Sequence, residues 1–154
     1  MEKFNLNINV NPIAASRPRV SRFSTYYNEP YRSHKELLKN KVLVANVGQS
    51  KPLFSRYRPL EMEINYYIKL PKLSSIRTKI LHETPHVFKP DLDNLVKATK
   101  DALNGLVYYD DAQVFSLTIN KYFTSDNPRT EIFIVDKTNE HKESFDINIK
   151  RGKK

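Results

Sequence analysis

The sequence predicts a single domain that combines several β-strands with two helices. Apolar and polar residues alternate over residues 4–10 and again over residues 60–69, the pattern of half-buried strands. Two other stretches, residues 29–45 and the segment from about residue 91 to residue 105, carry their apolar residues at helical spacing. A chain of 154 residues is long enough for a real core and most simply forms one domain.

The remaining segments complete this prediction. Residues 113–124 and 130–136 have strand character, and the polar turn between them, residues 124–128, favours a hairpin. Residues 71–88 resemble a loop, a short strand is possible at residues 145–149, and residues 137–154 form a charged, partly flexible tail. The second helix is expected to begin near Asp91 or Asp93 and to end near Gly105.

The charge balance favours an anionic partner. The chain has 26 Lys and Arg against 17 Asp and Glu, a net charge of +9, which makes nucleic acid the first candidate and solubility alone the alternative. It has no cysteine, so disulfides, thiolate nucleophiles and cysteine-based zinc sites are excluded. Its first residues do not form a signal peptide and no run approaches a membrane span, so we expect a soluble protein of the cytoplasm.

A basic, extended loop follows the first strand. It contains Arg17, Arg19 and Arg22, and tyrosines follow it. Arginines beside aromatic rings can bind phosphates and stack on unpaired bases, although a flexible, solvated loop has the same composition.

The acidic segment, residues 90–111, departs from the basic character of the chain. It holds five acids and only two bases, a local charge of −3. The acids are Asp91, Asp93, Asp101, Asp110 and Asp111. Like charges brought together destabilise a fold unless a cation compensates for them, so the concentration of acids in a basic chain points to a metal site.

Two or three carboxylates suffice to hold a magnesium ion, which can polarise a phosphodiester and position water. Lys97 lies one helical turn after Asp93 and could neutralise charge on a phosphate. Structural roles are the alternatives. Asp91 or Asp93 can cap the helix, Asp93 and Lys97 can form an exposed pair, and Asp110 with Asp111 can belong to a turn.

These residues resemble the RusA family of Holliday junction resolvases, which occurs in bacteria, phages and prophages. The resemblance rests on Lys89-Pro90-Asp91-Leu92-Asp93-Asn94-Leu95-x-Lys97, on Asp101-Ala102-Leu103-Asn104-Gly105, and on Asp110-Asp111-x-Gln113-Val114. Ser16-Arg17-Pro18-Arg19-Val20 is similar to the basic segment that follows the first strand in the family. The resemblance extends from about residue 6 to residue 136.

The resemblance implies an α+β fold, in which helices pack on a small mixed β-sheet, and a homodimer that nicks four-way DNA junctions symmetrically. It implies magnesium, with manganese as a substitute, and neither a small-molecule cofactor nor a membrane. By position, Asp91, Asp93 and Asp111 correspond to the metal-binding catalytic carboxylates, and Lys97 to the essential lysine. The resemblance implies a supporting role as a metal ligand for the adjacent Asp110. The resemblance also implies DNA contacts, and the DNA-binding candidates are Arg17, Arg19, Arg22, Lys89 and Lys121.

Two other functions fit the same residues. The first is a non-catalytic protein that binds branched DNA, in which the aspartates only cap helices and form turns. The second is a metal-dependent nuclease whose substrate is a flap, a nicked duplex or RNA.

Overall fold

A computed structural model describes residues 2–27, 29–46, 51–70 and 83–141 of the protein. Its main sheet has the strand order β1-β7-β4-β6-β5, and a separate ribbon pairs β2 with β3. The strands are β1 (Lys3–Ile8), β2 (Arg19–Val20), β3 (Thr25–Tyr26), β4 (Leu60–Lys69), β5 (Thr84–Pro85), β6 (Val114–Thr124) and β7 (Arg129–Asp136).

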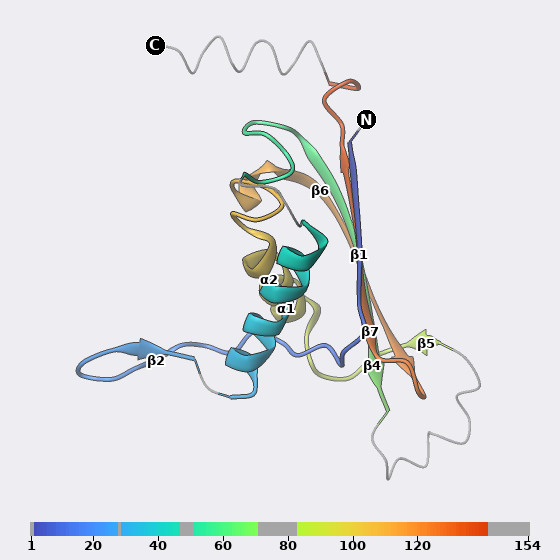
Figure 1. Ribbon diagram of the computed structural model, residues 1–154. Coiled ribbons are helices and arrows are strands. Elements are labelled where there is room, and N and C mark those ends of the chain that lie inside the picture. The colour runs from blue at the N-terminus through green and yellow to red at the C-terminus, as the bar shows by residue number, and fades with distance from the viewer. Residues whose placement is uncertain (1, 28, 47–50, 71–82, 142–154) are drawn as a thin grey trace.

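Two helices, α1 (Tyr31–Ala45) and α2 (Leu92–Leu103), lie on the same face of the main sheet (Figure 1). Strands β4 and β6 are parallel, whereas the other neighbours in this sheet are antiparallel. The sheet is therefore mixed, and the predicted α+β architecture is confirmed.

The central strand β4 has the bounds that the alternation predicted. Its even-numbered residues from Leu60 to Ile68 are buried and belong to the hydrophobic core. On the other face, Tyr67 is only 9% exposed because the guanidinium of Arg129 lies 3.5 Å from its ring centroid and Tyr122 stacks on it. Apolar burial on one face and side-chain stacking on the other keep β4 at the centre of the sheet.

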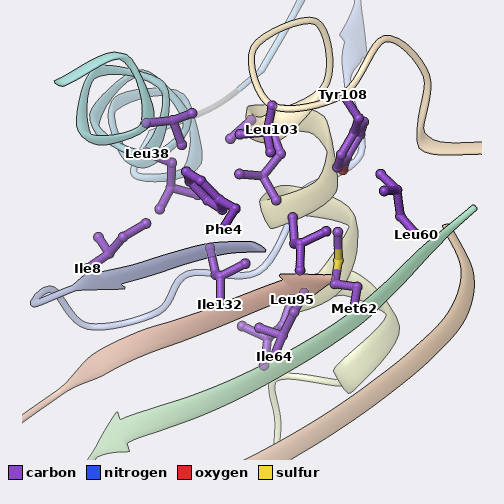
Figure 2. Packing of buried hydrophobic residues seen from close by; sticks show 14 of the residues in the cluster. Phe4, Ile8, Leu38, Leu60, Met62, Ile64, Leu95, Leu103, Tyr108 and Ile132 are labelled. Atoms are coloured by element: carbon purple, nitrogen blue, oxygen red, sulfur yellow. The ribbon is translucent and has the colours of Figure 1, made fainter. Parts of the chain in front are cut away.

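The core fills the space between the helices and the sheet (Figure 2). Every layer contributes to it, and the labelled members are Phe4, Ile8, Leu38, Leu60, Met62, Ile64, Leu95, Leu103, Tyr108 and Ile132. Burying a large apolar side chain stabilises the fold by about 1.5–3 kcal/mol, so this cluster fixes both helices on the sheet.

The predicted hairpin between residues 113–124 and 130–136 is wrong. Both strands form, as β6 and β7, but β4 lies between them and pairs with each. The polar connection at residues 125–128 therefore crosses the end of β4. A turn-rich sequence predicts a reversal of the chain but not which strand the returning segment pairs with, and here the most apolar strand lies between the two.

The basic segment after β1 is more ordered than an extended loop. Strands β2 and β3 form a two-stranded ribbon, and the hydroxyl of Ser21 accepts hydrogen bonds from the backbone N–H groups of Phe23 and Ser24 at its tip. The ribbon projects away from the helices and the main sheet (Figure 1). The predicted strand at residues 145–149 and most of the predicted tail lie outside the described residues.

One buried hydrogen bond links the central strand to α2. The hydroxyls of Tyr66 and Thr99 are 2.8 Å apart, and the hydroxyl of Thr99 also donates to the carbonyl oxygen of Leu95. Tyr66 is 1% exposed and Thr99 is 3% exposed, and burial raises the pKa of Tyr66, so its phenol remains neutral. The hydroxyl pair therefore fixes the position of α2 along β4.

Thr99→Val should lower the free energy of unfolding by about 1–3 kcal/mol, because it leaves the buried hydroxyl of Tyr66 without its partner. Tyr66→Phe should have a smaller effect, since Thr99 keeps its bond to the Leu95 carbonyl. The double variant should be more stable than the sum of the single changes predicts. Urea unfolding of the four proteins measures these differences, and strictly additive losses would contradict a direct hydroxyl pair.

Candidate active site

Two of the predicted metal ligands stand at the start of α2. Asp91 is the N-cap residue, with an extended backbone (φ −76°, ψ 147°), and Asp93 lies in the first turn. An N-cap aspartate ordinarily accepts a hydrogen bond from a backbone N–H of the first turn, but Asp91 makes no such bond. Within the described chain neither carboxylate has a hydrogen-bond or ion-pair partner, and both are exposed. Both carboxylates are therefore available to bind a ligand.

Lys121 of β6 fixes the chain that leads into α2. Its ammonium donates to the carbonyl oxygens of Phe88 (2.6 Å) and Pro90 (2.7 Å), and its own carbonyl accepts from the N–H of His86. The ring of His86 packs on Phe123, with centroids 4.0 Å apart. Burial lowers the pKa of His86, and the positive charge of Lys121 lowers it further.

The sequence resemblance suggested a DNA contact for Lys121. In the structure this side chain attaches the residues immediately before Asp91 to the sheet. A direct contact of Lys121 with DNA stays a prediction.

The chain turns back at the other end of α2. Gly105, at φ +77°, follows the last turn in the left-handed conformation that glycine adopts without strain, and its N–H donates to the carbonyl of Tyr108. The fully buried Tyr108 donates its hydroxyl hydrogen to the carbonyl of Lys100. Burial raises the pKa of Tyr108, and the nearby carboxylates of Asp111 and Asp101 add to this shift. The phenol is therefore neutral and fixes the turn beside the helix.

The two adjacent aspartates after this turn have different environments. Asp110 caps a short 3-10 turn, η2 (Asp111–Gln113). Its carboxylate accepts a hydrogen bond from the N–H of Ala112 at 2.9 Å, and the side-chain oxygen of Gln113 accepts one from the backbone N–H of Asp110. Gln113 in turn donates to the carbonyl of Ser55. Asp111 takes no part in this capping box. Its carboxylate lies 2.9 Å from the ammonium of Lys100.

The donor atoms fit a hard divalent cation, since carboxylate oxygens are the ligands that magnesium and manganese prefer and two of the three carboxylates have no other described partner. The arrangement is not closed, however. Across residues 2–27, 29–46, 51–70 and 83–141, no three His, Cys, Asp or Glu side chains lie together as a metal-binding group. Asp111, the third predicted ligand, pairs with Lys100 instead.

Lys100 was not among the sequence-based candidates. It lies on the same face of α2 as Asp93 and Lys97, and this position could have marked it as a candidate site residue. Its pairing with Asp111, however, depends on the turn after the helix. Lys97 itself is exposed, one helical turn after Asp93, and forms no ion pair with any residue that the structure describes.

The basic candidates occupy two places. Arg17, Arg19 and Arg22 lie on or beside the β2–β3 ribbon, and Lys89 lies two residues before Asp91. The ribbon also carries an aromatic side chain that the sequence analysis did not single out: Phe23, at its tip, is 92% exposed. The ring of Phe23 is therefore accessible to a ligand and lies next to Arg22 in the sequence.

Asp110→Ala should destabilise the protein by about 1 kcal/mol, the usual effect of removing a capping side chain. Asp91→Ala should change the stability by less than about 0.5 kcal/mol, since the carboxylate of Asp91 makes no cap bond. Urea unfolding in the presence of a chelator compares the two. Equal losses in both variants would show that Asp91 also has a structural role.

Neither helix of the described chain is long and apolar enough to cross a membrane. The sequence matches the family of endodeoxyribonuclease RusA over residues 9–135. It is also 35% identical over 133 residues to an uncharacterized protein of Bacillus subtilis (strain 168), YqaN, an alignment that covers 80% of this chain and 89% of YqaN.

The match covers most of the chain and includes α2, the capping turn at Asp110 and the strands that hold them. This protein therefore belongs to the RusA family of endodeoxyribonucleases, a membership that implies a Holliday junction resolvase.

Proposed function

We propose that this protein resolves four-way DNA junctions by paired, symmetric nicks and that the reaction depends on magnesium, with manganese as a substitute. Beyond family membership, one observation supports this proposal. The capping position and first turn of α2 carry two exposed carboxylates that no described residue engages, on a helix whose opposite face is buried. Asp91 occupies the N-cap position without making the usual capping bond, and departures of this kind are expected at functional sites.

Asp91, Asp93 and Asp111 would hold the ion, with Asp110 shaping the turn that carries Asp111. When bound, a divalent cation polarises the phosphodiester and stabilises the charge on the leaving oxygen. The protein itself contributes placement: Lys121 fixes the chain before Asp91, and the core holds α2 rigidly.

Lys97 would act on the substrate. Its ammonium is exposed and uncommitted in the described chain, one turn from Asp93. At that position it can contact a non-bridging phosphate oxygen and neutralise charge that develops on it. Lys97→Met should therefore impair cleavage more strongly than binding of DNA.

The β2–β3 ribbon would bind the DNA. Arginines on it can neutralise phosphates, and the exposed ring of Phe23 can stack on a base that is unpaired near the branch point. Contacts of this kind recognise the shape of the branched DNA more than its sequence. A four-way junction has approximate two-fold symmetry, so we expect a homodimer that presents two identical sites to opposed strands.

The first test uses labelled synthetic four-way junctions, with a linear duplex of matched sequence as control. Asp93→Asn should abolish cleavage in magnesium and in manganese, and it should retain or tighten junction binding because it removes a negative charge that faces the phosphates. Asp126→Asn, the same change on the exposed turn before β7, serves as the matched control and should cleave normally.

Each outcome of this test is informative. Metal-dependent paired nicks that require Asp93 support the proposal. Tight junction binding without nicking in any metal would favour a non-catalytic DNA-binding protein. Cleavage of flaps, nicked duplexes or RNA without preference for the junction would favour a nuclease of another substrate.

A second prediction concerns the ribbon. Arg22→Ala should weaken junction binding and reduce the slope of log affinity against log salt by about 1, because one phosphate contact is lost. Phe23→Ala should weaken binding to the junction but leave the salt slope unchanged, since stacking releases no counterions. Electrophoretic binding assays at several salt concentrations separate the two effects. Lys3→Ala, which removes an exposed positive charge from β1, is the control, and an equal loss in this variant would contradict a specific role of the ribbon.

A further inference from the structure

The ion pair between Lys100 and Asp111 joins two segments whose backbones are both fixed. The carbonyl of Lys100 accepts hydrogen bonds from the N–H of Asn104 (3.0 Å) and from the hydroxyl of Tyr108 (3.2 Å). Asp111 follows Asp110, which the capping box holds in place. The fold therefore fixes both backbones where the ammonium of Lys100 can reach the carboxylate of Asp111, and the two groups lie 2.9 Å apart.

The exposure of the pair makes it separable. The side chain of Lys100 is 22% exposed and that of Asp111 is 47% exposed, so water can solvate both groups when they part. Exposed and half-exposed ion pairs contribute little to stability because solvation offsets their attraction. Asp111 has no other ion-pair partner within the described chain.

The charge of the pair opposes a divalent cation. If Asp111 ligates the ion, as the proposed function requires, its carboxylate must either leave the ammonium of Lys100 or contact both cations at once. Two cations that approach the same carboxylate repel each other, so the lysine and the metal ion compete.

We propose that Lys100 is a positioning residue that holds Asp111 while the site is free of metal. It competes with the divalent cation for this carboxylate, a role that rests on the proposed function. Lys100 thereby sets the metal affinity. It neutralises the third carboxylate when no ion is bound, which limits repulsion among the acids around α2. Asp91 and Asp93 remain available to bind the ion first.

The test measures metal binding without DNA, by calorimetric titration of manganese into the full-length protein. Lys100→Met removes the charge and keeps an unbranched side chain of similar length. It should bind manganese about two- to fivefold more tightly than the wild type, the range that corresponds to loss of one partly exposed ion pair. Lys100→Arg retains the charge and should bind like the wild type. Lys100→Gln is a second neutral variant, should the methionine variant fail to fold.

The same titration in an Asp111→Asn background isolates the pair. There the Lys100→Met change should leave the manganese affinity unaltered, because the carboxylate for which the two cations compete is absent. An equal gain in both backgrounds would mean that Lys100 acts only through its general positive charge, and the proposal would be wrong. Unchanged or weaker binding by Lys100→Met, while the wild type binds manganese, would overturn this proposal and leave the proposed nuclease function intact. A wild-type protein that binds no manganese would overturn both.

Discussion

Helix α2 can expose two carboxylates at its start because its opposite face is buried against the sheet. Leu95 is 1% exposed, Leu103 is fully buried, and the hydroxyl of Thr99 bonds to Tyr66 of the central strand. This packing offsets the repulsion between the exposed carboxylates of Asp91 and Asp93, because neighbouring carboxylates destabilise a fold when no cation compensates for them. The site is thus supported by the core beneath it.

The same helix organises the rest of the acidic segment. At its first turn, Lys121 holds the preceding loop on the sheet through two backbone carbonyls. At its last turn, Tyr108 returns the chain so that Asp111 reaches Lys100. Both ends of α2 are therefore fixed by contacts with residues more than seven positions away in the sequence. Asp91 and Asp93 are thus held in place without using their carboxylates for structure, whereas Asp110 caps η2 and Asp111 pairs with Lys100.

The division between Asp110 and Asp111 shows how one structure separates chemically identical neighbours. A capping role commits the carboxylate of Asp110 to the backbone of η2, and that of Asp111 is left to pair with a lysine. The ammonium of Lys100 offsets the charge of Asp111, although the acidic segment as a whole carries −3 in a chain of net charge +9. The acidic segment therefore remains net negative in the absence of metal, within a chain that is otherwise basic.

The sequence by itself determined the two helices, the four longer strands, the acidic segment and the family. The alternation over residues 60–69 and the helical spacing of Leu95, Ala98 and Ala102 predicted β4 and α2, because periodicity depends only on which face of a segment is buried. Only the tertiary structure decided that β4 lies between β6 and β7, that Lys121 supports the loop before Asp91, and that Lys100 meets Asp111. Strand pairing and ion pairs of this kind depend on which distant segments the core brings together, and no local pattern in the chain records that choice.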